Sequence, residues 1–172
     1  MLRILAIALL LLCAPPAQAQ QARKLPYWAS ISAGRAMMRT GPAKEYPAVW
    51  EYRRADLPIR VVQIFKDWRK IQDPDGTTGW MQVKLLSDTR TALVTGKENQ
   101  PLYEKPDGSS AVRYYAQPGV VGRLSDCSLA WCRFDVNGRR GYIRASALYG
   151  LDPAKASNRP RASCSPARPP LC

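Results

Sequence analysis

The segment 67–80, DWRKIQDPDGTTGW, decides the fold because it holds two strand-like runs on either side of a turn. Residues 73–76, Asp-Pro-Asp-Gly, place Pro and Gly at the second and fourth positions, as a type I turn prefers. The flanking runs 68–72 and 78–82 alternate and contain β-branched or aromatic residues, which is typical of strands. The segment therefore predicts an antiparallel hairpin and not a chemical site.

The same pattern occurs a second time further along the chain. The matching pairs are Ala48 and Ala111, Tyr52 and Tyr115, and Trp68 and Trp131, each 63 positions apart, followed by Gly79 and Gly141 and by Leu86 and Leu148, each 62 apart. The residue lost between them lies in the turn, because the second copy turns on Asn137-Gly138, the signal of a two-residue hairpin. Two copies of one unit are predicted, with a variable loop and conserved flanking strands.

Strand patterns and the near absence of helical periodicity predict an all-β fold. The expected strands are 36–39, 49–52, 60–65, 68–72 and 78–82 in the first copy, and 100–103, 112–115, 120–124, 131–136 and 140–143 in the second. Residues 83–85 and 145–147 look like single helical turns, each before a short closing strand. Many short strands with Gly-rich and Pro-rich turns predict two small barrels in tandem, at 28–87 and 91–150, joined by a short connector that keeps them in contact or close to it.

Both ends of the chain differ from this pattern. Arg3, the apolar run 4–14 and the small residues before position 20 form a signal peptide, 1–19, with cleavage near Ala19/Gln20. The apolar run is too short to span a bilayer, so we expect a periplasmic or secreted protein with no transmembrane segment after cleavage. Cys13 raises a lipoprotein alternative, which the leucines before it disfavour. Residues 151–172 form a basic, Pro-rich tail for which we expect disorder.

Four cysteines remain after the signal peptide, and export to an oxidising compartment allows them to pair in three ways. We expect Cys127 to pair with Cys132, because the segment between them turns back on itself between two apolar stretches. A redox-active pair is the alternative, although its usual motif has two intervening residues where this chain has four. The sequence leaves Cys164 and Cys172 either paired with each other or free.

The composition excludes several function classes. The chain has no His and a formal net charge of +13. It therefore lacks the commonest general base and metal ligand, and we expect no catalytic residues, metal or cofactor. Asp73 and Asp75 suit a plain turn better than a cation loop. The positive charge has no dense run of the kind that follows a phosphate backbone, so we expect attraction to anionic envelope polymers and not to nucleic acid.

Two sets of motifs resemble the bacterial SH3 (SH3b) domain family. The first copy carries Arg39, Gly41, Pro42, Tyr46 and Pro47, then Trp68 and Ile71, then Gly79 and Trp80. The second resembles a two-cysteine variant, with Cys127, Trp131, Cys132, Arg133, Phe134, Gly141, Tyr142 and Ile143. The whole chain is similar to small exported tandem SH3-domain proteins of Gram-negative bacteria. The resemblance implies five-stranded to seven-stranded barrels and a binding role, which in some relatives is docking to cell-wall peptides beside a hydrolase domain.

Two departures from the family pattern bear on structure and binding. Asp56 stands where the family usually has Gly, which requires a left-handed backbone that Asp tolerates. The second copy has Glu-Lys-Pro-Asp at 104–107 in place of the Arg-x-Gly-Pro segment, which puts ligand contacts from that loop in doubt.

Aromatic side chains supply the candidate binding site. We expect Trp68, Trp131, Trp80 and Tyr142 to pack inside the barrels. Trp50 and Tyr52 share one strand face by alternation, near Tyr46, and a groove lined by aromatic residues suits an extended peptide. The predicted ligand-binding residues are Arg39, Tyr46, Trp50, Tyr52, Arg53, Tyr114 and Tyr115.

The sequence therefore predicts a non-enzymatic module that binds a peptidoglycan peptide or an envelope protein. One alternative is a periplasmic adaptor that organises a protein complex. The other is a thiol-disulfide factor using Cys127 and Cys132. The oligomeric state stays open.

Overall fold

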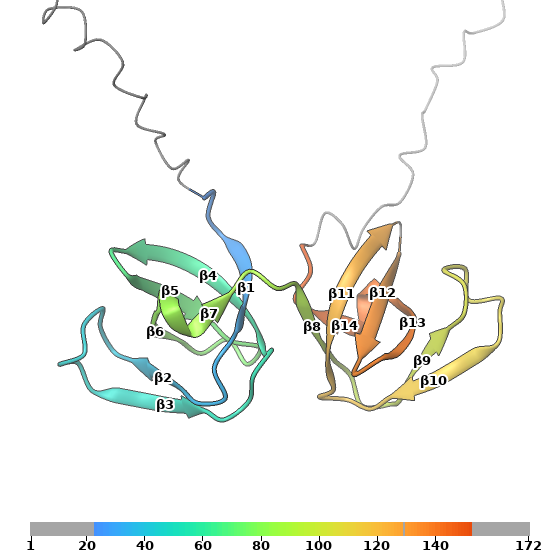
Figure 1. Cartoon of the computed structure of the whole chain (residues 1–172), viewed down its shortest axis with the longest axis horizontal. Coiled ribbons are helices and arrows are strands. Elements are labelled where there is room, and N and C mark those ends of the chain that lie inside the picture. The colour runs from blue at the N-terminus through green and yellow to red at the C-terminus, as the bar shows by residue number, and fades with distance from the viewer. Residues whose placement is uncertain (1–22, 129, 153–172) are drawn as a thin grey trace, which may run out of the picture.

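The computed structural model describes residues 23–128 and 130–152, which form two antiparallel sheets of seven strands each. Each sheet curls around its own core, and the two lie side by side (Figure 1). We refer to the sheet of strands β1–β7 as barrel 1 and to that of β8–β14 as barrel 2. The predictions for the signal peptide, for most of the tail and for Cys13, Cys164 and Cys172 lie outside the described residues.

Barrel 1 has the strand order β3-β2-β6-β5-β4-β1-β7. Its elements are β1 (Tyr27–Ile31), β2 (Ala36–Arg39), β3 (Ala48–Tyr52), β4 (Pro58–Phe65), β5 (Trp68–Gln72), β6 (Thr78–Gln82), a 3-10 turn (Val83–Leu85) and β7 (Leu86–Ser87). The hairpin predicted from segment 67–80 is β5 and β6, which pair in register from Trp68 opposite Gln82 to Gln72 opposite Thr78.

Barrel 2 repeats the same order as β10-β9-β13-β12-β11-β8-β14. Its elements are β8 (Thr91–Val94), β9 (Gln100–Tyr103), β10 (Val112–Ala116), β11 (Val121–Ser128), β12 (Trp131–Val136), β13 (Arg139–Arg144), a 3-10 turn (Ala145–Ala147) and β14 (Leu148–Tyr149). Each strand therefore has an equivalent seven strands earlier, and the internal repeat seen in the sequence is a repeat of structure.

Strands β1 and β8 are missing from the sequence prediction. Each begins its barrel and lies between partners that come later in the chain: β1 pairs with β4 and β7, and β8 pairs with β11 and β14. Neither strand has a hairpin turn to mark it, since its pairing is not local. The ten strands predicted with bounds, the two short closing strands and both helical turns are confirmed, with bounds that differ by four residues at most.

The turns have the backbone that their residues predicted. The Gly76 N–H donates to the Asp73 carbonyl at 3.1 Å, which closes the turn between β5 and β6. Asn137 and Gly138 both have positive φ, 51° and 86°, as a two-residue hairpin requires. Asp56 has φ 62°, so the left-handed backbone expected from the family pattern is confirmed.

Each barrel has its own apolar core. The core of barrel 1 contains Ala29, Ile31, Ala36, Met38, Tyr52, Ile59, Val61, Ile71 and Met81. The core of barrel 2 contains Ala92, Val94, Leu102, Ala116, Cys132, Phe134, Ile143, Ala145, Leu148 and Leu151. Glycine at 79 and 141 permits tight packing, because a Cβ at Gly79 would lie 2.5 Å from Met38 and one at Gly141 would lie 2.7 Å from Leu102.

The predicted disulfide is present between Cys127 and Cys132. The two residues lie opposite each other on β11 and β12, so the bond staples this hairpin. Cys132 is fully buried in the core of barrel 2, whereas Cys127 is partly buried against it.

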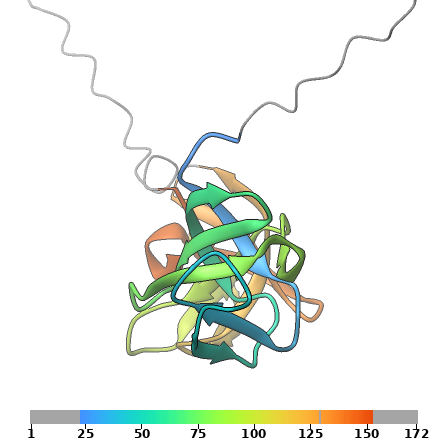
Figure 2. The same cartoon turned by 90° about the vertical axis from the view of Figure 1, so that its left-hand side faces the viewer.

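The two barrels contact each other through the end of barrel 2. The Tyr149 hydroxyl donates to the Asp73 carbonyl in barrel 1 at 2.9 Å, and its ring packs edge-on against Trp28 at 5.0 Å. Gly150 has φ +113°, and a Cβ there would lie 3.1 Å from the Pro58 Cβ of barrel 1. In the end-on view of Figure 2, barrel 1 faces the viewer and largely covers barrel 2. The contact expected from the short connector is therefore confirmed.

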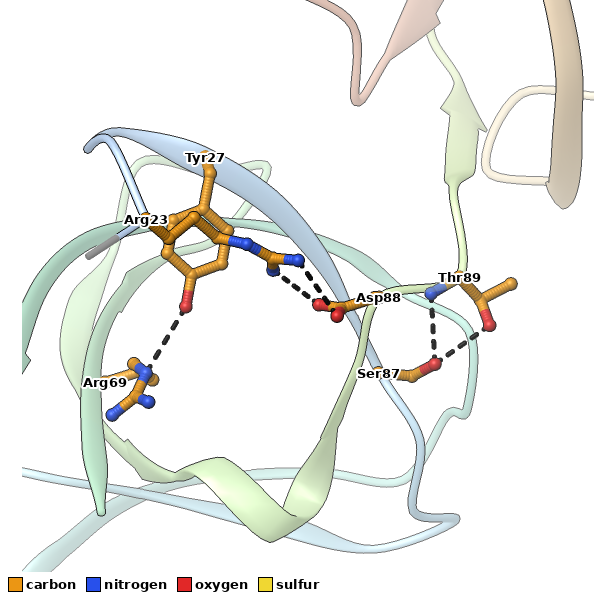
Figure 3. Close-up of polar contacts among 6 residues, drawn as sticks. All are labelled: Arg23, Tyr27, Arg69, Ser87, Asp88 and Thr89. Atoms are coloured by element: carbon orange, nitrogen blue, oxygen red, sulfur yellow. Dashed lines mark hydrogen bonds and ion pairs between the residues drawn. The ribbon is translucent and has the colours of Figure 1, made fainter. Parts of the chain in front are cut away.

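The start of the connector is tied to the first described residues (Figure 3). Arg23 donates two hydrogen bonds to the Asp88 carboxylate, at 2.5 and 2.9 Å, and its guanidinium stacks 4.7 Å from the Tyr27 ring centre. The Arg69 Nε donates to the Tyr27 hydroxyl at 3.3 Å. These contacts join the N-terminal segment, β5 and the connector at one side of barrel 1.

Candidate functional site

The loop 40–47 between β2 and β3 is fixed by its own residues. The Thr40 N–H donates to the Pro47 carbonyl at 3.1 Å, and Arg39 Nη1 donates to the Tyr46 carbonyl at 2.7 Å. The Tyr46 ring lies against Gly41, where a Cβ would stand 2.5 Å from ring carbons. Tyr46 is thus held in place while 47% of it stays exposed.

A cavity of 200 Å³ lies beside this loop, and we refer to it as the Trp68 groove. Its lining residues are Arg35, Met37, Arg39, Lys44, Trp68, Gln82 and Leu85. Trp68 begins β5 and lies opposite Gln82 of β6, which places the indole next to the groove. It is 8% exposed, yet it does not belong to the apolar core of barrel 1. The expectation that Trp68 packs inside is confirmed for its burial but not for core membership.

The charge around the groove is mainly positive. Arg35, Arg39 and Lys44 line it. Glu51 on β3 accepts from Arg35 Nη2 at 2.5 Å and from Arg53 Nε at 2.6 Å. The Arg53 hydrogen bond, followed by that of Arg35, lowers the pKa of Glu51 and keeps it ionised. Arg53 is therefore occupied by an internal ion pair, whereas Arg39 lines the groove directly.

Two exposed apolar side chains lie on the outer strands of barrel 1. Met37 on β2 is 40% exposed, and Trp50 on β3 is 59% exposed. Strand β3 lies at the edge of the sheet and pairs only with β2, where Met38 lies opposite Trp50. Met37 lines the groove, whereas the register places Trp50 on the other face of the β2–β3 pair, the face of Met38.

Tyr52 shares a strand face with Trp50 as predicted, but it is buried, so its assignment to an exposed binding site was wrong. It is 7% exposed, and its hydroxyl donates to Asp73 Oδ2 at 2.9 Å. Tyr52 lies opposite Ala36 and Trp50 opposite Met38, on one face as alternation predicts, but Tyr52 belongs to the core of barrel 1 whereas Trp50 stays exposed. Burial and the Asp73 hydrogen bond raise the pKa of Tyr52 well above its usual range.

The remaining predicted site residues lie in the other barrel. Tyr114 and Tyr115 are 42% and 67% exposed on β10, the edge strand of barrel 2. The structure therefore separates the predicted residues into two groups, one per barrel (Figure 1). Arg39, Tyr46 and Trp50 gather around β2 and β3, and the two tyrosines occupy the equivalent strand of the repeat.

The sequence model of the family described as "Bacterial SH3 domain" matches residues 32–88 and 96–150. The chain belongs to the bacterial SH3 domain family. The two matches correspond to barrel 1 and barrel 2, which are therefore two SH3 domains in tandem. Domains of this family commonly bind the cell wall, and the family match contains no catalytic domain. No curated protein matches the chain.

Solved structures similar to these tandem SH3 domains include NlpC2 from Trichomonas vaginalis and an NlpC/P60 family protein from Bacillus cereus ATCC 10987. NlpC2 is 12% identical, with a TM-score of 0.34 over 77% of this chain and 52% of that chain. The Bacillus protein is 16% identical, with a TM-score of 0.32 over 71% of this chain and 55% of that chain. This chain spans about half the length of each.

In the second SH3 domain, side chains and a loop pack on the tryptophan that corresponds to Trp68. Trp131 is the equivalent of Trp68, and the Arg144 guanidinium lies 4.9 Å from its ring centre. Tyr103 packs edge-on against the same ring at 5.4 Å. A Cβ at Gly108 would lie 2.9 Å from the indole, so the loop after β9 also presses on it. The two SH3 domains therefore differ in this groove.

Sequence reasoning missed most residues of the Trp68 groove. Arg35, Met37, Lys44, Gln82 and Leu85 come from separate segments, and only the strand register brings them to one place. A signal was present in the aligned repeats, where Arg39 and Gln82 beside Trp68 correspond to Tyr103 and Arg144 beside Trp131. Gln82 is shorter than arginine and uncharged, and it leaves the groove of barrel 1 open. In barrel 2 the equivalent Arg144 stacks on the Trp131 ring.

Metal binding, membrane spanning and disulfide exchange were also compared with the described part of the tandem SH3 domains. Among residues 23–128 and 130–152, no group of three metal-ligating side chains lies together. No helix in that part of the chain is long and apolar enough to cross a membrane. Redox exchange through Cys127 and Cys132 would need access to a sulfur, and the Cys132 side of the bond is fully buried.

Proposed function

We propose that this protein is an exported, non-enzymatic binding protein that docks to cell-wall peptides through barrel 1. The observation that carries the proposal is the Trp68 groove, open in barrel 1 and filled in barrel 2. Family membership supports cell-wall binding, and the signal-peptide pattern of residues 1–19 supports export to the periplasm or beyond.

The groove suits an extended peptide that carries carboxylates. Met37 and the edge of the Trp68 indole line the groove, and the exposed Tyr46 ring lies in the flanking loop, so an extended chain can dock there with little loss of entropy. Arg39 and Lys44 then supply charge-assisted hydrogen bonds to carboxylate groups of the ligand. Stem peptides of peptidoglycan combine an extended backbone with such carboxylates.

Co-sedimentation of residues 20–172 with purified peptidoglycan sacculi tests the proposal. High salt must be included, because a strongly basic chain adheres to anionic polymers non-specifically. We expect salt-resistant binding that Met37→Ala or Lys44→Gln weakens at least about tenfold, the cost of one good contact. Tyr115→Ala in barrel 2 is the matched control and should bind as the wild type does. Binding that high salt abolishes, or equal loss in the control, contradicts the proposal.

A protein partner in the envelope is the second candidate, favoured by the edge strand of barrel 2. Strand β10 carries exposed Val112, Tyr114 and Tyr115, and it pairs only with β9. An exposed apolar edge strand can accept an extended segment of another protein as an additional strand. Sacculi would then fail to retain the protein, and Tyr115→Ala would weaken the complex with its partner.

A further inference from the structure

Barrel 2 carries a cluster of arginines on one face of its central hairpin. Arg123 on β11 lies opposite Asp135 on β12, and Asp135 lies opposite Arg140 on β13. Arg133 precedes Asp135 by two positions on β12, so alternation places both side chains on the same face of the sheet. Three guanidinium groups and one carboxylate thus gather on three adjacent strands, away from the Trp68 groove.

This cluster surrounds a cavity of 340 Å³. The lining residues are Arg123, Leu124, Ser125, Arg133, Asp135 and Arg140. A second cavity of 310 Å³ shares Arg123, Asp135 and Arg140 and reaches Asp56 of barrel 1. The arginine cavity therefore opens toward the junction between the two barrels.

Asp135 holds one arginine and leaves the other two available. Its Oδ2 accepts from Arg140 Nε at 2.6 Å, and its Oδ1 accepts from the Gly138 N–H at 2.7 Å. The Arg140 hydrogen bond, followed by that of Gly138, lowers the pKa of Asp135, so the carboxylate stays ionised. Within the described residues, the guanidinium groups of Arg123 and Arg133 make no hydrogen bond or ion pair. The cavity therefore has a net charge of +2.

The equivalent face of barrel 1 contacts the end of barrel 2. Arg60 and Gln72 occupy the positions of Arg123 and Asp135, since Arg60 lies opposite Gln72 on β4 and β5. Residues 148–152 at the end of barrel 2 line the same cavity as Arg60 and Gln72, and the Tyr149 hydroxyl reaches the neighbouring backbone. Barrel 1 uses this face to bind barrel 2, whereas the arginines on the equivalent face of barrel 2 stay exposed, with Asp56 of barrel 1 at the edge of the second cavity.

We propose that the arginine cavity of barrel 2 binds a phosphate group. A carboxylate has two acceptor oxygens and satisfies one guanidinium, as Asp135 already does for Arg140. A phosphate group carries more charge and at least three acceptor oxygens, which matches the two free guanidinium groups and the Ser125 hydroxyl. The ligand is either a small phosphate compound or a polymer with phosphate groups.

Calorimetric titration of residues 20–172 with inorganic pyrophosphate and with polyphosphate tests this site. The variant R123Q/R133Q removes two charges from the cavity. R54Q/K97Q is its control, because it removes two charges from exposed residues outside the cavity. We expect saturable binding that R123Q/R133Q weakens at least about tenfold, since charge-assisted hydrogen bonds are lost, and that the control changes less than about twofold.

The two probes distinguish the source of the phosphate. Binding of pyrophosphate assigns a small ligand, whereas binding of polyphosphate alone, with the same loss in R123Q/R133Q, assigns a polymer. Equal weakening in both double variants would show attraction to overall charge only and would overturn the site. No saturable binding of either probe would overturn it too, as would binding of malonate, a dicarboxylate, as tightly as pyrophosphate.

Discussion

Asp73 accepts hydrogen bonds from three different parts of the protein. Its Oδ1 accepts from the N–H groups of Asp75 and Thr77, at 3.1 and 2.8 Å, and its Oδ2 accepts from the buried Tyr52 hydroxyl. Its carbonyl also receives the Tyr149 hydroxyl from barrel 2. One residue of the β5–β6 turn thereby joins the turn, the core and the contact between the barrels.

Replacing Asp73 should destabilise the protein more than its place in a turn suggests. Asp73→Ala leaves the buried Tyr52 hydroxyl with only the weak Met38 sulfur acceptor at 3.7 Å, and we expect the free energy of unfolding to fall by about 3 kcal/mol. Asp75→Ala is the control, because Asp75 is exposed two residues away and should change stability by less than about 0.5 kcal/mol. Urea unfolding measures both, and equal effects would show that Asp73 acts only as a turn residue.

At the residue scale the sequence predicted backbone conformation better than side-chain surroundings. Asp56 and Asn137 have the positive φ that their positions implied, because a turn is decided by residues a few positions apart. Tyr52 was expected at the surface and is buried, since its hydrogen bond depends on Asp73 in another hairpin. Local patterns cannot show which distant side chain lies opposite.

The same limit applies at the scale of strands. Hairpins such as β5–β6 and β12–β13 were predicted, because the turn between two strands is itself a sequence signal. The strands β1 and β8 were missed, because each is held by partners that are distant in sequence. The Trp68 groove was missed for a related reason, since its residues come from β2, β5, β6, two loops and the first 3-10 turn.

The disulfide should contribute modestly to the stability of the β11–β12 hairpin. It joins residues separated by five positions, and closing so short a loop stabilises the fold by about 2 kcal/mol on the chain-entropy estimate. The variant C127A/C132A should therefore fold, with a lower free energy of unfolding by about that amount, and should keep the binding activity of barrel 1. Thermal unfolding and sacculus binding measure the two effects. A variant that fails to fold would show that barrel 2 depends on the bond.

At the scale of the whole molecule, the two barrels share a fold but differ in the surfaces that they expose. Barrel 1 has an open groove and gives one sheet face to the contact between the barrels, whereas barrel 2 has a filled groove and an uncovered arginine face. The duplicated sequence predicted two copies of one fold. It did not predict this difference between the two barrels. The difference results from a few substitutions, such as Gln82 in barrel 1 at the position of Arg144 in barrel 2.

Alkaline pH should weaken the contact between the barrels through Tyr149. Burial, followed by the charge of Asp73, raises the pKa of Tyr149 to about 12. A raised pKa means that this group stabilises the folded state fully below about pH 10, the value in the unfolded chain, and loses that effect as pH rises toward about 12. The melting temperature should fall more steeply between these values in the wild type than in Tyr149→Phe, whose ring does not titrate. Parallel curves would contradict this role.

The central claim, that barrel 1 and not barrel 2 binds cell-wall peptide, is tested most directly by the tryptophan indole N–H signals in NMR. The five tryptophans report on different places, among them Trp68 in the groove, Trp50 on the outer surface and Trp131 in barrel 2. On titration of labelled protein with a soluble peptidoglycan stem peptide, we predict a saturable shift of the Trp68 signal and an unchanged Trp131 signal. A shift at Trp131 alone, or no shift at any of the five, would contradict it.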